Sequence, residues 1–517
     1  MMEVELKLSL DERHADALRR HPLLKAYATR QPYEQEMADI YFDTPGQDLR
    51  QHRAGLRVRQ VGAQWIQTMK GGGSVEGGLH RRHEWESAVD GPQPELGALR
   101  ELVGKHGPYA DLLASAVVDH GLAPIFQTHV QRMVWDLVLP HGDSVECVLD
   151  QGHVDCGELQ VPISELELEL KSGNPVHLFD FALELQRLIP MHIGTLSKAE
   201  RGYALFAPQP VQAVKASALA LSKRMSLEQV FQAIMVNCMT QVQANEAGVT
   251  GAQDIECLHQ MRVGLRRLRS AFDLYRGLLP VPPELLDDID WLSAQLGPAR
   301  DWDVLAGATL PCLAQLLPAL QSETAATGLD PLAPAARQRA MAAHAVAAQA
   351  LQSSRYTALV LRFTRWVQGA GWREHMTLQE WNRLTAPLRQ FASATLERDQ
   401  RRLHKRGRRL RLADPATRHR VRIAAKKARY ALEFFASLYK PRKVRTYLAA
   451  LSELQDGLGW LNDLAVADRL LLELQGEADG VAASAAYARG FLACHLQHAP
   501  KQMQRSWNRF ALLKLPS

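Results

Sequence analysis

Cysteine is scarce in this sequence and widely scattered. Six cysteines occur among 517 residues, and no two of them are spaced as a Cys-x-x-Cys pair. Such pairs are typical of structural zinc sites, and a high cysteine content is typical of small disulfide-bonded domains. The sequence therefore indicates neither, and it favours a reducing cytoplasm as the location of the chain.

Long apolar stretches and a secretion signal are also lacking. No run of about eighteen apolar residues occurs, and the chain is charged from Glu3 onward instead of basic and then apolar. We therefore expect no membrane as a partner. The net charge of +5 says little about other partners, while the length of 517 residues predicts two or three domains.

Alternation of apolar and charged residues dominates the chain as far as about residue 205. It is clearest at 3–8, 55–59 and 165–171. A period of two predicts β-strands, and glycine-containing segments such as Gly71-Gly72-Gly73 predict the turns between them. Short helices are expected near residues 11–20, 94–105 and 177–189.

A change of period divides the chain. Residues 207–225 are rich in proline and alanine and predict a linker, and beyond them the apolar residues follow a helical period. We therefore predict an α+β protein in which a β domain at 1–206 is followed by an all-α domain at 226–517.

The helical part contains an internal repeat. Residues 258–269 match residues 418–429 position by position, and residues 296–301 match residues 458–463. A repeat of this length predicts two related helical bundles packed as pseudo-symmetric halves.

Several predicted strands have one wholly charged face. On the first strand Glu3, Glu5 and Lys7 share a face, because residues two apart point the same way. A single charged face is usually solvated at a sheet edge. Charged residues at even spacing along a strand recur, however, in four more sets: Arg57/Arg59, Arg82/Glu84/Glu86, Glu146/Asp150 and Glu165/Glu167/Glu169/Lys171. A closed barrel explains all of them, with charges in the lumen and apolar residues under covering helices.

Such a lumen requires bound ions. Two like charges 4 Å apart repel by roughly 1 kcal/mol in water and by more in a partly dry site. Carboxylates suit hard cations such as Mg²⁺ or Mn²⁺, whereas arginine and lysine bind phosphate oxygens. A lumen that contains both signs therefore predicts a polyanion bridged to carboxylates through metal.

Glu3-Val4-Glu5-Leu6-Lys7 has the E-x-E-x-K pattern, and over about residues 1–206 the chain resembles the CYTH family, the triphosphate tunnel metalloenzymes. The resemblance rests on an ordered set of further segments: Tyr41-Phe42-Asp43-Thr44-Pro45, Leu56-Arg57-Val58-Arg59, Trp65 to Lys70, Arg82-His83-Glu84-Trp85-Glu86, Arg132, Asp150, Glu167-Leu168-Glu169-Leu170 and Leu196 to Tyr203.

This resemblance implies an eight-stranded antiparallel tunnel, flanked by helices, that binds triphosphate. It implies metal ligands at Glu3, Glu5, Glu167 and Glu169, although the extra acid Glu165 leaves open which carboxylates of that strand are ligands. The implied phosphate-binding residues are Lys7, Arg57, Arg59, Lys70, Arg82, Arg132, Lys171, Lys198 and Arg201. Glu5, Lys7 and Glu169 are the predicted catalytic residues.

The two repeat helices carry matching basic stripes. At about 100° per residue the first stripe consists of His259, Arg262, Arg266 and Arg269, and the second of His419, Arg422, Lys426 and Arg429. One basic helix face is usually just solvated, and one histidine is more often structural than functional. Because the pattern occurs twice in register, we predict a pocket or groove that binds an anion.

Nucleic acid and polyphosphate are the rival ligands of this half. Fourteen Lys/Arg and only two Asp lie between Arg398 and Arg429, a density that attracts polyanions. Interleaved aromatic residues for base stacking are lacking, which argues against nucleic acid. From about Ser226 onward the chain resembles the CHAD domain, a helical module associated with inorganic polyphosphate. Besides the two basic helices, this resemblance rests on residues 300–303 and on Asn462-Asp463.

Together the two resemblances imply an inorganic triphosphatase that depends on Mg²⁺ or Mn²⁺. The expected reaction is hydrolysis of tripolyphosphate to phosphate and pyrophosphate, with polyphosphate bound by the helical half and the protein associated with polyphosphate granules. Two alternatives stay open. The substrate could be an organic triphosphate, such as thiamine triphosphate or a nucleotide, or both halves could bind polyphosphate without catalysis.

Overall fold

The computed structural model describes residues 2–316, 329–408, 410, 415–476, 479–498 and 500–516. Its internal contacts divide the chain into two compact units. The first consists of residues 1–210 together with 352–369, and the second of residues 211–351 together with 370–517.

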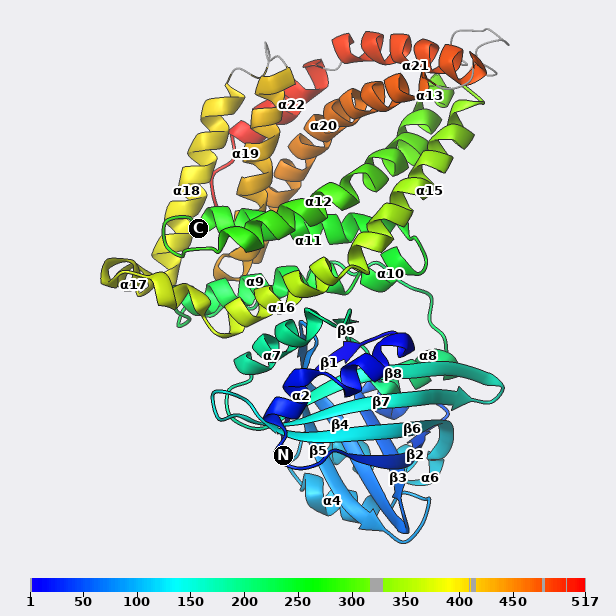
Figure 1. The fold of residues 1–517 in the computed structure, drawn as a ribbon. Helices are drawn as coiled ribbons and strands as arrows, with labels where there is room; N and C mark the ends of the chain where they lie inside the picture. The colour runs from blue at the N-terminus through cyan, green and yellow to red at the C-terminus, as the bar shows by residue number, and fades with distance from the viewer. Residues whose placement is uncertain are drawn as a thin grey trace. The chain divides into compact units, whose positions relative to one another are not determined.

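A closed antiparallel barrel forms the first unit (Figure 1). The strand order is β5-β4-β3-β2-β6-β7-β8-β1, and pairing of β1 with β5 closes the ring, while the short β9 pairs with the other part of β1. This confirms the predicted eight-stranded tunnel. The strands are β1 Met2–Ser9, β2 Tyr33–Asp43, β3 Ala54–Val61, β4 Gln64–Glu76, β5 Leu79–Val89, β6 Ala123–Val138, β7 Ser144–Cys156, β8 Leu159–Ser172 and β9 His192–Ile193.

Short helices flank the barrel, and those expected near 11–20, 94–105 and 177–189 are present. The helices are η1 Glu12–His14, α1 Ala15–Arg19, α2 Pro22–Tyr27, α3 Asp48–Gln51, α4 Leu96–Val103, α5 Ala110–Ala114, α6 Ala116–Gly121, α7 Val176–Gln186 and α8 Lys198–Phe206.

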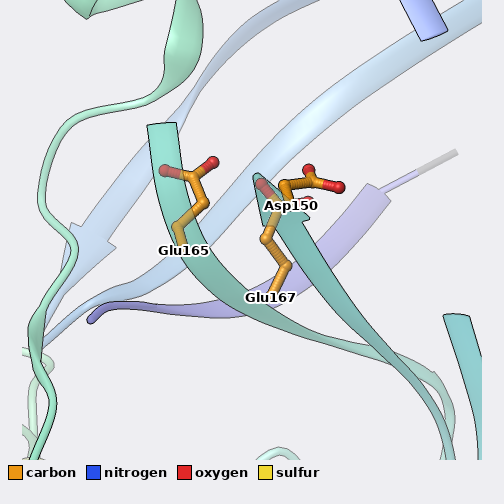
Figure 2. A group of neighbouring side chains, drawn as sticks. All are labelled: Asp150, Glu165 and Glu167. Carbon is orange, nitrogen blue, oxygen red and sulfur yellow. The ribbon is translucent and has the colours of Figure 1, made fainter. Parts of the chain in front are cut away.

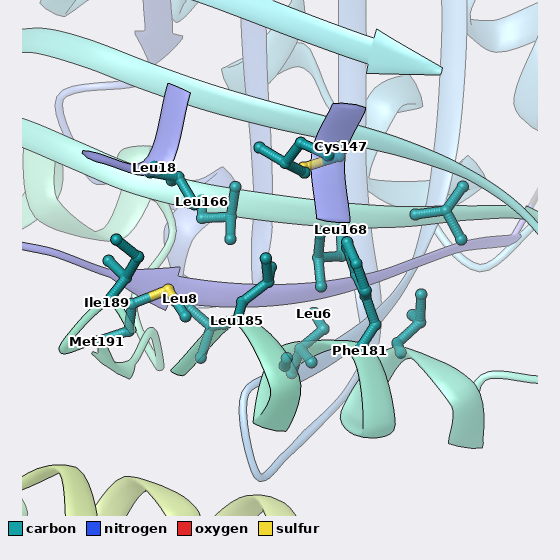
Figure 3. Close-up of a cluster of buried hydrophobic side chains, with 14 of the residues drawn as sticks. Leu6, Leu8, Leu18, Cys147, Leu166, Leu168, Phe181, Leu185, Ile189 and Met191 are labelled. Carbon is teal, nitrogen blue, oxygen red and sulfur yellow. The ribbon is translucent and has the colours of Figure 1, made fainter. Parts of the chain in front are cut away.

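The apolar face of the barrel packs outward, under these helices. Leu6 and Leu8 of β1 are fully buried against α7, where Phe181 and Leu185 belong to the same cluster (Figure 3). Each fully buried leucine contributes about 1.5–3 kcal/mol to folding. Because the side chains of a strand alternate, this burial forces Glu3, Glu5 and Lys7 to the inner face.

A helix from the C-terminal part of the sequence completes this core. Helix α16, Ser354–Gln368, belongs to the first compact unit, and its Leu361 lies in the same apolar cluster. The Thr357 hydroxyl donates a hydrogen bond of 2.8 Å to the Met191 carbonyl, and the Gln186 amide donates one of 2.8 Å to the Ser354 carbonyl. The sequence did not indicate this contribution to the barrel unit.

The glycine run at 71–73 was wrongly predicted to be a turn. It lies inside β4, where the register with β5 shifts between Gly71 and Ser74, so it forms a bulge. Gly73 has φ +83°, and a Cβ there would lie 1.6 Å from the Arg81 carbonyl oxygen, so only glycine fits. The turn between β4 and β5 is made by Gly77 and Gly78, which also have positive φ.

The described residues of the second unit form helices and no strands, as predicted. The helices are α9 Leu227–Gln243, α10 Glu246–Thr250, α11 Ile255–Leu274, α12 Pro283–Val304, η2 Leu305–Thr309, α13 Leu310–Leu316, α15 Leu332–Leu351, η4 Gly371–His375, α17 Leu378–Leu384, α18 Leu388–Gly407, α19 Pro415–Phe434, η6 Ala436–Leu438, α20 Pro441–Leu474, α21 Asp479–His498 and α22 Pro500–Ala511. Among the described helices, none combines the length and the apolar character needed to cross a membrane.

The sequence repeat appears as a repeated helix order. The basic helix α11 packs on α9 and leads into α12, and the basic helix α19 packs on α18 and leads into α20. Helices α11 and α19 also contact each other, as do α12 and α20. The two related helix pairs therefore lie side by side in one unit.

Residues 207–222, most of the predicted linker, have no regular secondary structure. From residue 211 the chain nevertheless belongs to the second unit. The backbone of Val214 exchanges two hydrogen bonds of 2.9 Å with the Asn245 side chain, and the Asn237 amide donates one of 3.0 Å to the Ser217 carbonyl. These bonds fix the C-terminal part of the segment to the helices.

Candidate functional site

The strand register brings the predicted metal ligands together. Glu5 of β1 lies opposite Glu169 of β8, and Lys7 lies opposite Glu167. On the other side of β1, Glu3 lies opposite Arg82. Cross-strand partners share a face, so the carboxylates of Glu3, Glu5, Glu167 and Glu169 all line the bore.

Glu167 lies among three cations. Its carboxylate forms ion pairs with Lys7, with Lys198 at 2.9 Å and with Arg132 at 3.3 Å. Burial acts to raise the pKa of Glu167, but Lys198, Lys7 and Arg132 outweigh it and hold that pKa well below its usual range. Glu167 is therefore an anion at neutral pH.

Glu167 also belongs to a compact cluster of three buried carboxylates with Asp150 and Glu165. One oxygen from each lies within 4.8 Å of the others (Figure 2). Lys198 binds Asp150 at 2.6 Å and also contacts Glu165, Arg132 binds Asp150 at 2.6 Å, and Arg201 binds Glu165. Because cations already compensate these acids, this cluster is charge-balanced without a metal. It shares only Glu167 with the predicted ligand set.

The compensation is weaker on the Glu169 side of the bore. Burial raises the pKa of Glu169, Lys171 at 2.7 Å lowers it, and the nearby carboxylates of Glu3 and Glu146 raise it again, so that the net shift is upward. Burial is the main cause of this rise, and the ion pairs show the charge balance: Lys171 is shared by Glu169 and Glu146, and Lys70 is shared by Glu3 and Glu84, so carboxylates outnumber cations on this side. The oxygen ligands of Glu3, Glu5 and Glu169 therefore fit a hard divalent cation.

Asp39 is a lumen residue that sequence reasoning missed. It is buried opposite Arg59, with Arg59 nitrogens 2.6 and 2.9 Å from its oxygens and an Arg57 nitrogen at 3.3 Å. Burial acts to raise the pKa of Asp39, but Arg59 and Arg57 hold it far below its usual range. The neighbours of Asp39 on its face of β2 are Met37 and Tyr41, so the strand lacks the charged pattern that identified the others.

All predicted phosphate-binding side chains of the tunnel form ion pairs. Besides those already described, Lys70 binds Glu3 at 2.7 Å and Glu84 at 3.0 Å, and Lys171 binds Glu146 at 3.3 Å. Arg82 lies 3.4 Å from Glu200. The lumen is therefore lined by a network of ion pairs. A bound anion would replace carboxylates as the partners of these cations.

One end of the inner face is apolar and is covered by α8. Tyr41 stacks on Phe126 with ring centroids 4.6 Å apart, and Tyr203 of α8 meets Phe126 edge-on at 5.4 Å. Gly202 allows this approach, because a Cβ there would lie 2.1 Å from the Phe126 ring. Helix α8 begins with a capping box between Ser197 and Glu200, which fixes the first turn and directs Lys198 into the bore.

In the helical unit, four of the predicted anion-binding cations form no ion pair with any described residue. These are Arg262 and Arg266 of α11 and Arg422 and Lys426 of α19. Arg262 donates instead to the Ser293 carbonyl at 3.4 Å, and Arg422 donates to the carbonyls of Leu458 and Gly459 at 3.3 and 3.1 Å. We call these four residues the cation cluster.

Mutual repulsion and burial act on the cation cluster. Burial, Arg422 and Arg266 lower the pKa of Lys426 to about 7, and burial and Arg266 lower that of Arg262 to about 10. Asp301 and Asp463 lie nearby, and burial raises the pKa of both acids. The cluster therefore holds excess positive charge that an anion would stabilise.

The other predicted residues of the basic stripes have different surroundings. Arg269 is paired with Asp290, and Arg429 binds Glu433 at 2.7 Å. Burial, with Arg300 close by, lowers the pKa of His259 to about 4, so its ring is neutral at pH 7. His419 is exposed. Arg409, Arg411 and Asp414 of the basic segment lie outside the described residues.

Comparison with known proteins agrees with this two-part architecture. Residues 1–203 match the CYTH domain family and residues 233–472 match the CHAD domain family. Over 210 residues the chain is 34% identical to the inorganic triphosphatase of Haemophilus influenzae. The matched region is 40% of this chain and 56% of that protein. The chain thus spans about half the length of this curated relative.

The helical unit also resembles a solved structure. The crystal structure of the CHAD domain from the plant Ricinus communis is 39% identical, has a TM-score of 0.52, and covers 59% of this chain and 99% of that chain. Because the two family matches follow one another along most of the sequence, as the barrel and the helices do in the structure, this chain belongs to the proteins that join an N-terminal CYTH domain to a C-terminal CHAD domain.

Proposed function

We propose that the CYTH domain hydrolyses inorganic triphosphate to phosphate and pyrophosphate with the help of Mg²⁺ or Mn²⁺. The observation that carries this proposal is the closed bore in which Lys7, Arg132 and Lys198 surround Glu167, beside the surplus acids at Glu169. Such a bore suits a short, highly charged anion together with a cation. The relative from Haemophilus influenzae, an inorganic triphosphatase, supports the same substrate.

The proposed reaction asks the protein mainly for positioning and charge neutralisation. A water oxygen bonds to a terminal phosphorus, the bridging P–O bond breaks, pyrophosphate leaves with the electron pair of that bond, and the protons of the water end on the oxygens of the two products or in the solvent. Lys7, Arg132 and Lys198 would bind phosphate oxygens and stabilise the charge that develops on them. Glu3, Glu5, Glu167 and Glu169 would hold the divalent cation, which supplies further charge neutralisation when bound.

A substrate comparison tests this assignment. We expect the purified chain to release phosphate from tripolyphosphate at least tenfold faster than from ATP or thiamine triphosphate, because the proposed phosphate-binding side chains are all charged and the rings of Tyr41, Phe126 and Tyr203 pack against one another instead of offering a free face to a base. EDTA should abolish release, and added Mg²⁺ or Mn²⁺ should restore it. Preference for ATP or thiamine triphosphate would instead identify an organic triphosphatase, and metal-independent binding without release would identify a scaffold.

We further propose that the CHAD domain binds inorganic polyphosphate through the cation cluster and associates the protein with polyphosphate granules in the cytoplasm. Arg262, Arg266, Arg422 and Lys426 support this proposal, because four half-buried cations that form no ion pair and have only Asp301 and Asp463 nearby favour a polyanion over a single phosphate.

Polyphosphate binding should weaken as the pH rises from 6 to 8. The pKa of Lys426 is about 7, so its ammonium is charged at pH 6 and largely neutral at pH 8. The neighbouring arginines stay charged throughout, and His259, with a pKa near 4, stays neutral. We expect roughly a threefold to tenfold loss of affinity for one lost charge, measured by calorimetry with long-chain polyphosphate.

Lys426→Arg is the control for this prediction, because arginine stays charged at pH 8. The variant should lose most of the pH dependence. An unchanged dependence in the variant would assign the effect to another group, with Asp301 and Asp463 the nearest acids.

A further inference from the structure

We infer that His80 is a positioning residue that orients Arg82 toward the substrate through the Nδ1 atom of its ring. This inference rests on the proposed function and on the sequence prediction that Arg82 is one of the residues that bind phosphate oxygens. His80 lies on β5, two residues before Arg82, and is completely buried.

Both ring nitrogens of His80 have a partner. Nη2 of Arg82 lies 2.9 Å from Nδ1, and the carbonyl oxygen of Gly194 lies 2.9 Å from Nε2. A guanidinium group has donors only, so Nδ1 must accept and cannot carry a proton. Nε2 then carries the proton and donates a hydrogen bond to the Gly194 carbonyl. The ring is therefore neutral and has one defined tautomer.

Arg82 has two anchors in the structure. Its Nη2 atom is 2.9 Å from His80 and 3.4 Å from the Glu200 carboxylate, which is about half exposed. Glu200 is the more distant of the two, and its Oε2 atom already accepts two hydrogen bonds of 2.7 Å from Ser197, whereas the His80 ring is completely buried and lies closer to Arg82. His80 is therefore the partner that can keep Arg82 beside Glu3, its neighbour across the β1–β5 ladder.

His80 also connects Arg82 to the rest of the cation set. The Gly194 carbonyl accepts the hydrogen bond from Nε2 of His80, and the Gly194 amide donates a hydrogen bond of 2.9 Å to the Lys7 carbonyl. A Cβ at position 194 would lie 2.9 Å from the Lys7 Cβ, so this glycine permits close packing on β1. The same segment continues to Lys198. The buried ring thus connects the Arg82 side chain to the backbone of Lys7 through Gly194.

Two substitutions separate positioning of Arg82 from simple support of the Gly194 loop. Asparagine at position 80 can place its oxygen near the Nδ1 position, where it would accept from Arg82, but it cannot reach Gly194. Glutamine can place its amide near the Nε2 position, where it would donate to Gly194, but it leaves Arg82 without an acceptor. Positioning of Arg82 predicts that asparagine is the better replacement, whereas loop support alone predicts the reverse.

The experiment compares His80→Asn, His80→Gln, Arg82→Ala and the double variant His80→Gln/Arg82→Ala. Tripolyphosphate binding is measured by calorimetry, KM and kcat by phosphate release, and folding by thermal unfolding. We expect His80→Gln to raise Kd and KM on the order of tenfold with a smaller change in kcat, because a hydrogen bond to a charged group is lost. His80→Asn should stay within about threefold of the wild type.

The double variant supplies the decisive comparison. On the Arg82→Ala background His80→Gln should change KM less than about twofold, since the contact it removes is already absent. Additive effects of the two substitutions, or a lower KM for His80→Gln than for His80→Asn, would overturn the inference. A wild type that neither binds nor hydrolyses tripolyphosphate would overturn the proposed function itself, which is a different result from an active wild type with an unresponsive His80.

Discussion

Replacing Glu5 and Glu169 together by glutamine is expected to reduce metal-dependent hydrolysis of tripolyphosphate by roughly a hundredfold or more. The two residues face each other across the β1–β8 ladder, on the side of the bore where carboxylates outnumber their cations. Glutamine keeps the shape of both side chains but removes two of the charges that would hold a divalent cation. Phosphate release with titrated Mg²⁺ or Mn²⁺ measures the effect.

Glu12→Gln/Glu158→Gln is the matched control, because both residues are exposed and the change in net charge is the same. The control should keep wild-type activity. If the Glu5/Glu169 variant were as active as the wild type, the cation would have to be held elsewhere. The cluster of Asp150, Glu165 and Glu167 would then be the next candidate. Absence of metal-dependent release from both wild type and variant would favour the scaffold alternative.

The second large effect is expected in the CHAD domain. Replacing Arg262, Arg266, Arg422 and Lys426 by alanine should weaken polyphosphate binding roughly a hundredfold at low salt and make it less sensitive to salt, because fewer counterions are exchanged. Tripolyphosphate hydrolysis should stay within about twofold of the wild type, since the proposed reaction lies in the barrel. Retention on immobilised polyphosphate over a salt gradient measures the first effect and phosphate release the second.

A variant with the same loss of charge distinguishes a defined site from a diffuse positive field. Arg401, Arg402, Lys405 and Arg406 of α18 are exposed and basic, and their replacement by alanine also removes four positive charges. We expect at most a few-fold loss of polyphosphate binding in this control. Equal losses in the two variants would assign binding to overall charge, and loss of hydrolysis in the first variant would contradict the separation of roles.

Strand periodicity alone predicted which charged side chains face the lumen, whereas the roles of those side chains, and the inclusion of residues such as Lys70 and Lys198, came from the resemblance to the CYTH family. The alternation at residues 3–8 and 165–171 identified which side chains share a face, and the apolar opposite face showed that the charges had to point inward. The repeat likewise identified Arg262 and Arg422 as equivalent before the structure placed each against the carbonyls of the following helix.

Other features carried no local signal. Asp39 stands alone among apolar neighbours on its face, so only its pairing with Arg59 marks it as part of the lumen. Helix α16 reads as one more amphipathic helix, and its place in the barrel unit depends on contacts such as that of Thr357 with Met191. The glycine run at 71–73 has the composition of a turn, and the close approach of Arg81 makes it a bulge.

The amino-acid sequence by itself determined the two-part architecture, the inward charged face of the barrel and the doubled basic helix, because each depends on a period that neighbouring residues express directly. Only the tertiary structure decided which acid lies beside which cation, since Lys7 meets Glu167 across 160 positions of chain through strand register and barrel closure. Electrostatic interaction depends steeply on distance and burial. The same set of charges therefore becomes a balanced cluster at Glu167, a surplus of acid at Glu169 and an unpaired cation cluster between α11 and α19.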